Sequence, residues 1–137
     1  ALHNIGATEV SLEDGVGYVL PEDLDDTTTP GSWVALLPSL DSSVMGWKDR
    51  EWYLGDYASQ LYDRNGNAGP TVWVDGRIVG AWGQRASGEI VYRLLEDVGE
   101  DAETRLAAKA GALEAWLGDT RIKARFPTPI EKSIINS

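Results

Sequence analysis

The pair Asp75-Gly76 constrains the fold of this sequence more than any other feature, because two runs rich in β-branched and aromatic residues flank it. Residues 71–74 precede the pair and residues 77–82 follow it. Asp-Gly pairs adopt the positive φ angles that a two-residue hairpin turn requires. Residues 89–95 have the composition of one more strand. The sequence therefore predicts at least three consecutive antiparallel strands.

The segment after these strands is the strongest helix candidate in the sequence. Between residues 100 and 117, small and apolar side chains recur every three or four positions, which places them on one helical stripe. Three acids stand in its first turn, where the helix dipole favours negative charge, and Gly118 follows as a C-cap. Pro127 and Pro129 exclude a long helix in the tail. The stripe consists of Ala102, Leu106, Ala110, Leu113 and Leu117.

The first half of the chain predicts shorter elements. Apolar residues alternate on both sides of Asp14-Gly15, which indicates a first hairpin. Residues 21–32 carry the acids, Pro and Gly of a surface loop, and we expect them to connect elements of one domain rather than to link two. Residues 33–37 form an apolar run that predicts a buried strand. Residues 39–50 are expected to turn or coil, residues 52–54 to form a strand, and residues 57–63 a short helix.

Together these elements predict an α+β fold. We expect an antiparallel sheet of five or six strands, curled into a partial barrel, with one long C-terminal helix and one or two short helices. A chain of 137 residues can bury one core of ordinary size. The first residue is Ala rather than Met, so residues 1–7 are interpreted as a disordered start or an expression boundary. Residues 8–118 are then the domain of a larger protein, and residues 119–137 a basic tail packed on it.

The charge balance limits the partners of this chain. Its net charge is −10, and residues 119–137 hold four basic against two acidic side chains, which leaves −12 on residues 1–118. Duplex DNA repels net negative charge unless a local basic surface overrides it. Any contact with DNA must therefore be local. No apolar stretch is long enough to cross a bilayer, so no membrane partner is expected.

Few residues could carry chemistry. The chain has no cysteine and a single histidine, His3, near its start, which excludes Ser-His-Asp, Cys-His and most zinc chemistry. Carboxylate catalysis stays open, and Asp41 and Asp49 are the acids that bracket an apolar, Gly-containing turn. A turn cap, or an ion pair with Arg50, explains them better than catalysis. We expect no catalytic residue, no metal and no cofactor in this chain.

Six tryptophans invite a base-stacking hypothesis, because aromatic faces next to cations can hold unpaired bases. Trp33, Trp73 and Trp82 lie in predicted strands, and Trp116 lies near the apolar side of the predicted helix. Packing in the core is the better explanation for these four. Trp47 has basic neighbours and is the one candidate for stacking.

Two blocks of the sequence carry motif residues in a specific order. In the first block, residues 36–50, a Leu-Leu-Pro run leads to an Asp, then a Gly, then an Asp-Arg pair. In the second, residues 65–82, a hairpin has Val-Asp-Gly-Arg at its turn and Gly-x-Trp at its end. In this order of motif residues the chain resembles the AlkZ/YcaQ-like family of crosslink-repair DNA glycosylases, and the resemblance covers roughly residues 8–131. The matching motif residues are Leu36, Leu37, Pro38, Asp41, Gly46, Asp49, Arg50, Pro70, Asp75, Gly76, Gly80 and Trp82.

The resemblance implies a bacterial parent enzyme, built from tandem winged helices that line a basic cleft for duplex DNA, with a glutamine-containing catalytic motif in an N-terminal region that this chain does not match. Residues 57–63 and the hairpin at 71–82 then resemble a winged helix with Arg77 at the wing tip, where cations commonly meet phosphates. The implied partners are the N-terminal winged-helix domains of the parent chain and duplex DNA, and the implied location is the cytoplasm, associated with the nucleoid. The other candidate DNA contacts are Lys48, Arg50, Arg64, Arg85, Arg121, Lys123 and Arg125.

The sequence thus favours a non-catalytic C-terminal domain that supports the DNA-binding cleft of a winged-helix protein. One alternative is a protein-interaction or assembly module without DNA contact, which the acidic composition and the aromatic residues favour. Another is a small hydrolase with two carboxylates about 5–9.5 Å apart.

Overall fold

A computed structural model describes residues 1–13, 15–25 and 27–137 of the chain. They form two compact units, Ala1–Gly31 and Ser32–Ser137, which are described separately. The boundary falls inside residues 21–32. This stretch was expected to connect elements of one domain, and it instead contains the end of one unit and the start of the next.

The first unit is a hairpin between two short 3₁₀ helices. Strand β1 (Thr8–Leu12) pairs antiparallel with β2 (Gly15–Val19), as the alternation predicts. The predicted turn residue Asp14 lies outside the described residues. Helix η1 (Leu2–Ile5) occupies the start that was expected to be disordered, and η2 (Pro21–Asp23) follows the hairpin. Within this unit the hairpin leaves large apolar side chains exposed, among them Leu12, Val16 and Tyr18.

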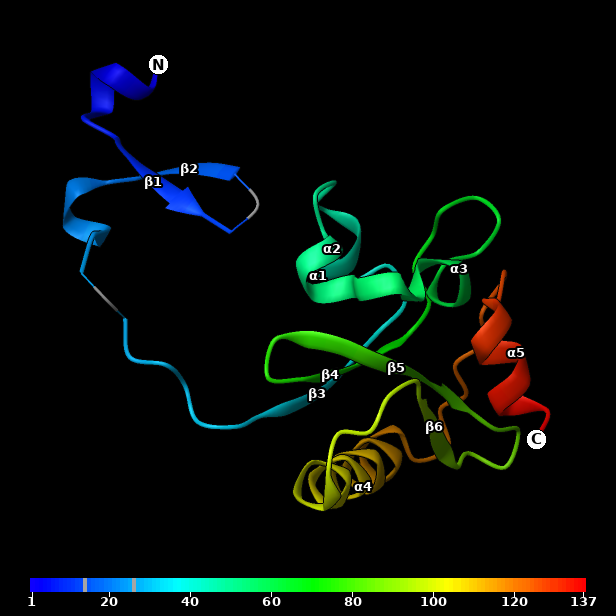
Figure 1. Cartoon of the computed structure of the whole chain (residues 1–137). Coiled ribbons are helices and arrows are strands. Elements are labelled where there is room, and N and C mark those ends of the chain that lie inside the picture. The colour runs from blue at the N-terminus through cyan, green and yellow to red at the C-terminus, as the bar shows by residue number, and fades with distance from the viewer. Residues whose placement is uncertain (14, 26) are drawn as a thin grey trace. The chain divides into compact units, whose positions relative to one another are not determined.

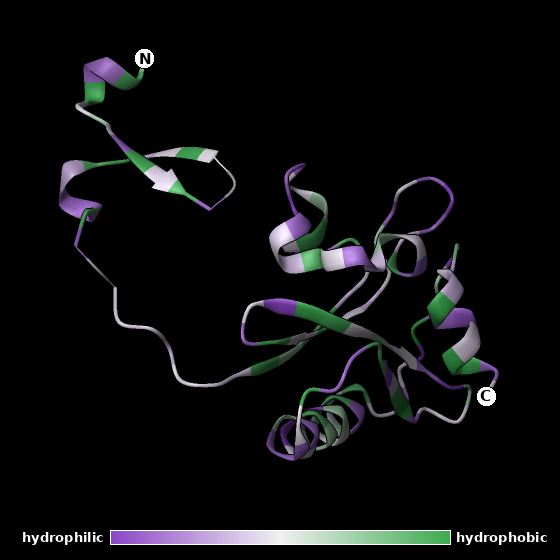
Figure 2. Cartoon of the chain, in the orientation of Figure 1, coloured by the Kyte–Doolittle hydropathy of each residue, from purple (hydrophilic) through white to green (hydrophobic). Residues whose placement is uncertain are grey.

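The second unit is built on a four-stranded antiparallel sheet with strand order β3-β4-β5-β6. The strands are β3 (Val34–Leu37), β4 (Thr71–Val74), β5 (Arg77–Gln84) and β6 (Ile90–Leu94). The predicted run of consecutive strands is confirmed, as is the tight turn: Asp75 and Gly76 have φ angles of 48° and 87°. Figure 2 shows apolar residues along the middle of β5, whereas its start at Arg77 is polar.

Helices cover both faces of this sheet (Figure 1). Helix α4 (Glu100–Leu117) packs on one face, where Leu106 and Ala110 join a core with Val72, Val79 and Trp82. The other face carries α1 (Ser42–Met45), α2 (Glu51–Leu54), η3 (Gly55–Tyr57), α3 (Ala58–Leu61) and α5 (Pro129–Ile135), whose apolar side chains form a second core.

Helix α4 has the bounds that the sequence predicts, and its apolar stripe faces the sheet. Leu106 is fully buried, and Gly118 ends the helix with a φ of 52°. Trp116 differs from the expectation, because its side chain is 80% exposed. It precedes Leu117 of the stripe by one position, a rotation of about 100° around the helix axis, which turns the indole to the flank of the helix.

Two predictions for the shorter segments need correction. Residues 52–54 were expected to be a strand, but they lie in α2, whose Leu54 N–H bonds to the carbonyl of Arg50 at 3.0 Å. Tyr53 and Leu54 are both buried while Trp52 is exposed, a pattern that a strand with alternating faces cannot produce. Residues 39–50 contain the helical turn α1 rather than coil alone.

The predicted helix at 57–63 is confirmed as η3 and α3. Helix α5 was not predicted. It is short, and Pro129 stands in its first turn, where proline is tolerated.

The fold is α+β, as predicted, but the strands of the described residues do not close a partial barrel. Within residues 1–13, 15–25 and 27–137, strands β1 and β2 pair with each other and with no further strand, so the six strands form sheets of two and four. The alternation of apolar and polar residues along a strand does not show which strand it pairs with. The predicted single sheet of five or six strands was therefore wrong. None of the helices in the described part of the chain is long and apolar enough to cross a membrane.

Candidate nucleic-acid interface

The first motif block forms the turn between β3 and α2. Asp41 is the N-cap of α1, and its carboxylate accepts a hydrogen bond from the Ser43 N–H at 2.8 Å. Gly46 ends α1, and a Cβ at this position would lie 2.7 Å from the carbonyl oxygen of Ser42. The turn cap considered for Asp41 is therefore what the structure contains. Asp49 is exposed.

Arg50 points inward and braces this turn. Its Nη1 donates to the carbonyl oxygen of Val44 at 2.8 Å, and its guanidinium lies 4.7 Å from the centroid of the Tyr62 ring. The Tyr62 hydroxyl donates to the same carbonyl at 3.0 Å. Burial raises the pKa of Tyr62, although the charge of Arg50 opposes that rise. This arrangement makes Arg50 a structural residue that holds α1 to α3.

The second motif block is joined to the first through Trp82. Its indole Nε1 donates to the carbonyl oxygen of Leu37 at 2.8 Å, across the sheet from β5 to the end of β3. Trp82 is buried, and its backbone N–H bonds to the carbonyl of Pro70. Leu36 and Leu37 pack against opposite cores of the sheet.

Gly80 has no room for a side chain. A Cβ on Gly80 would lie 2.2 Å from the carbonyl oxygen of Arg93 on β6. In the pairing of β5 with β4, the register skips Val79 between Ile78 and Gly80, so a bulge directly precedes this close approach of β5 to β6. At the hairpin turn, Asp75 accepts a hydrogen bond from the Trp33 N–H at 2.7 Å. Backbone roles are thus established for four of the motif glycines and acids, namely Asp41, Gly46, Asp75 and Gly80.

Arg77, the predicted wing-tip cation, is engaged in an ion pair. Its Nη2 lies 2.7 Å from a carboxylate oxygen of Glu96, and the Tyr57 hydroxyl donates to the other oxygen at 2.7 Å. The bond to Glu96 raises the pKa of Tyr57. The Arg77 side chain is still 59% exposed. The ion pair could not be predicted from the residues near Arg77, because Glu96 is 19 residues away in the sequence. A contact between Arg77 and DNA stays a prediction.

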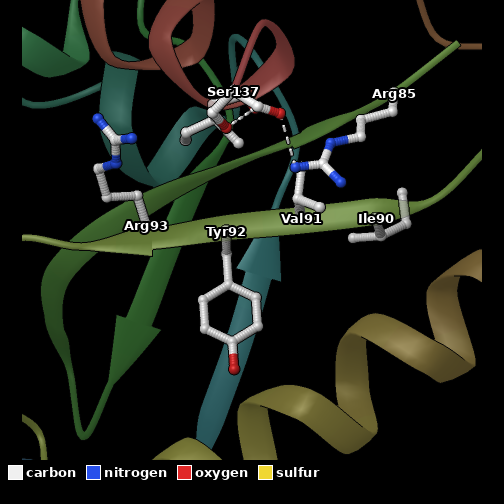
Figure 3. A pocket seen from close by; sticks show the side chains of 7 residues that line it. Arg85, Ile90, Val91, Tyr92, Arg93 and Ser137 are labelled. Carbon is white, nitrogen blue, oxygen red and sulfur yellow. Dashed lines mark hydrogen bonds between the residues drawn. The ribbon is translucent and has the colours of Figure 1, made fainter.

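Arg85 and Arg121 bind the protein itself. Arg85 forms an ion pair with Glu89 at 2.7 Å. It also donates to the carbonyl oxygen of Ser137 at 3.0 Å, and a dashed line in Figure 3 marks this bond. Arg121 donates to four carbonyl oxygens at the β5–β6 turn and the end of α4, and so fastens the start of the tail to the sheet. These oxygens belong to Ala86, Ser87, Gly118 and Thr120.

A recess of about 290 Å³ lies between β6 and the end of α5. Figure 3 shows Arg85 and Arg93 on the side of β6 that faces Ser137, with Tyr92 on the opposite side. Arg93, which the sequence analysis did not single out, donates to the Ser133 hydroxyl at 2.7 Å. Both arginines therefore serve to hold α5 on the sheet.

The remaining predicted cations lie at the surface. Lys48, Arg64, Lys123 and Arg125 are exposed, and no ion pair to them occurs within residues 1–13, 15–25 and 27–137. Arg64 stands at the tip of a loop that the Asp63 carboxylate closes with bonds from the backbone N–H groups of Asn65 and Asn67 and from the Asn67 amide. These bonds lower the pKa of Asp63.

Lys48 and Arg64 lie on two segments that bond to each other. The Tyr62 hydroxyl reaches Val44 in α1, and the Ala68 N–H lies 3.2 Å from the sulfur of Met45. Trp47 and Trp52, 60% and 69% exposed, belong to the same α1–α2 region. The sequence predicted Trp47 as a candidate for base stacking. It did not indicate Trp52, because residues 52–54 were predicted to form a strand.

The described residues contain no group of three or more His, Cys, Asp or Glu side chains that could hold a metal ion. His3 is exposed in η1. The most buried acid is Glu131, which forms a capping box with Thr128 at the start of α5. Burial raises the pKa of Glu131, and a bond from the Thr128 N–H opposes this. Its role is structural.

The family of this chain follows from its match to a model of a known protein family. The model of the AlkZ-like DNA glycosylase family matches residues 1–116. The chain belongs to this AlkZ-like family. No curated protein and no solved structure matches the chain. The match spans both compact units and ends within α4, so it includes the two motif blocks and the surface that carries Lys48 and Arg64. Membership connects this AlkZ-like chain to DNA repair and to DNA binding.

Proposed function

We propose that this chain is a non-catalytic part of an AlkZ-like glycosylase, which buttresses the DNA-binding cleft and contacts the DNA backbone locally. The proposal rests on one observation, namely that family-motif residues make hydrogen bonds inside the domain. Trp82 bonds to Leu37, Arg50 to Val44, and Asp41 caps α1. All three residues make hydrogen bonds within the domain, and these bonds give each of them a structural role.

The distribution of cations supports a local contact with DNA. Arg50, Arg85 and Arg121 are bound to carbonyl oxygens of the protein. Lys48 and Arg64 are exposed on neighbouring segments, and phosphate oxygens would be suitable partners for them. Arg77 would have to share its guanidinium with Glu96, so we expect it to contribute less.

The winged-helix interpretation of η3, α3 and the β4–β5 hairpin belongs to this proposal. Short helical turns precede the hairpin, and the hairpin ends in the tight turn at Asp75-Gly76. In this interpretation the neighbouring winged-helix domains of the parent chain supply the rest of the cleft, including the catalytic motif. The expected cellular location, in the cytoplasm near the nucleoid, follows from such a role.

Binding of a fluorescent duplex tests the DNA contact. We expect weak, salt-sensitive binding that is reduced in Lys48→Glu and Arg64→Glu. Lys109→Glu is the matched control, because it makes the same change of charge on α4. If the control weakens binding as much as the two variants, net charge rather than a local contact explains the result.

An excision assay tests the non-catalytic role. The chain is incubated with duplex that contains an alkylated purine, and abasic sites are counted after cleavage in alkali. We expect the count to equal that of duplex without protein. Abasic sites above that background, removed by substitution of Asp41 or Asp49, would revive the carboxylate hypothesis instead.

A further inference from the structure

The two edge strands of the four-stranded sheet are protected very differently. On β6, the Ile90 N–H at the outer edge bonds to the Glu114 carboxylate at 3.1 Å, and Arg93 places a charge within the strand. Such charges are among the features by which proteins prevent edge-to-edge pairing. Strand β3 has the sequence Val-Ala-Leu-Leu, without a charge, a proline or a bulge. An apolar edge of this kind favours pairing with another strand.

The backbone of β3 is available for such pairing at two positions. Trp33 and Asp75 form a hydrogen-bonded pair, because the Asp75 N–H donates to the Trp33 carbonyl at 3.1 Å. Bonding alternates along an antiparallel strand, so Val34 and Leu36 direct their N–H and C=O groups away from β4. Among the described residues, no hydrogen bond from another element meets these groups of Val34 and Leu36.

A groove of about 510 Å³ lies beside this edge. Trp33 and Val34 line it on the β3 side, and Ala108 and Ala112 on α4 form a floor of small side chains. Small residues let another backbone approach closely. Trp33, one of the lining residues, is 38% exposed.

The groove carries positive charge in a chain whose net charge is −10. Arg105 donates to the Ser32 carbonyl at 2.6 Å and pairs with Asp101 at 2.9 Å, so its position is fixed and its charge is shared. Lys109 lies one turn further along α4 and is exposed, and no ion pair to it occurs in the part of the chain that the structure describes. An acidic group in the groove would complement Lys109.

We propose that this groove binds an extended peptide segment, which pairs with β3 as a fifth strand and directs an acidic side chain toward Lys109. Alternate side chains of such a segment point to one face, so small apolar residues would lie over Ala108 and Ala112. A nucleic-acid strand offers negative charge as well, but it cannot form a ladder with the N–H and C=O groups of Val34 and Leu36. The function is protein recognition and goes beyond the proposed contact with DNA.

The test uses the whole chain and an acetylated, amidated octapeptide of alternating valine and glutamate. Binding is followed by the amide resonances of the isotope-labelled chain. We expect shifts at Val34, Leu36 and Lys109, and slowed hydrogen exchange of the Val34 and Leu36 amides on addition of peptide. Amides of Val34 and Leu36 that are already protected in the free chain would overturn the proposal, because the edge would then be closed.

Two variations separate backbone pairing from charge. Methylation of the peptide nitrogens that face β3 should abolish binding, since an added strand needs those donors. Lys109→Glu should weaken binding roughly three- to tenfold, as expected for one partly exposed charge pair that is reversed. Lys132→Glu, the matched control on α5, should leave the Kd unchanged. Equal affinity for the methylated peptide, or displacement of the peptide from the groove by a single-stranded oligonucleotide, would contradict the proposal.

Discussion

Replacement of Trp82 by phenylalanine tests whether the two motif blocks are coupled as the structure shows. The indole Nε1 bonds to the Leu37 carbonyl at 2.8 Å, and the side chain is 4% exposed. Loss of one hydrogen bond costs about 0.5–1.5 kcal/mol. Loss of two buried ring carbons costs about 0.8 kcal/mol each. The free energy of unfolding should therefore fall by about 2–3 kcal/mol in Trp82→Phe.

Urea unfolding followed by circular dichroism measures this change. With an m-value of about 2 kcal/mol/M, the midpoint should move down by about 1–1.5 M. Trp52→Phe is the control, because Trp52 is 69% exposed and a surface substitution of this kind changes stability by about 0.5 kcal/mol or less. A change in Trp82→Phe no larger than that of the control would refute the coupling through Leu37.

Three more predictions concern stability. Gly80→Ala should destabilise the chain by about 1–3 kcal/mol or more, because its Cβ would lie 2.2 Å from the Arg93 carbonyl; thermal unfolding with an unchanged Tm would show that the strands separate freely. Tyr53→Phe should be neutral or stabilising, because the buried Tyr53 hydroxyl has no hydrogen-bond partner among the described residues; a loss above about 1 kcal/mol in urea unfolding would reveal a partner. Burial raises the pKa of Glu131 above 4.5, so the folded state binds the carboxyl proton more tightly than the unfolded state does. The contribution of Glu131 to the free energy of unfolding is therefore full below pH 4.5 and is lost as pH rises through the raised pKa. The difference in stability between the chain and Glu131→Gln should follow that trend between pH 4 and 7, and a difference that is constant with pH would contradict it.

Local sequence patterns predicted the elements whose geometry is decided locally. The Asp75-Gly76 turn needs only two residues with positive φ, and α4 needs only a stripe at helical spacing. The error at residues 52–54 arose because a run of three apolar residues has no readable period. In the structure the N–H groups of Tyr53 and Leu54 both bond to the Arg50 carbonyl, and this local backbone bonding makes the segment a helical turn.

The candidate interface could be predicted only as a set of cations. Sequence shows which residues are basic, but not whether a carbonyl or an acid from a distant segment engages them. Arg121 meets carbonyls 34 and 35 residues away, and Arg77 meets Glu96. The position of β3 at the edge of the sheet could not be predicted for the same reason. Strand order depends on how strands pair in the folded chain, and the sequence of a single strand does not reveal it.

The salt dependence of duplex binding tests the central claim most directly. It is measured by fluorescence anisotropy for the chain and for the double variant Lys48→Glu/Arg64→Glu. We predict binding that weakens as salt rises, with a slope of log K against log salt that becomes shallower by about 2 in the double variant, about one unit for each phosphate contact. Absence of binding at low salt, or an unchanged slope in the double variant, would contradict a local DNA contact at this surface.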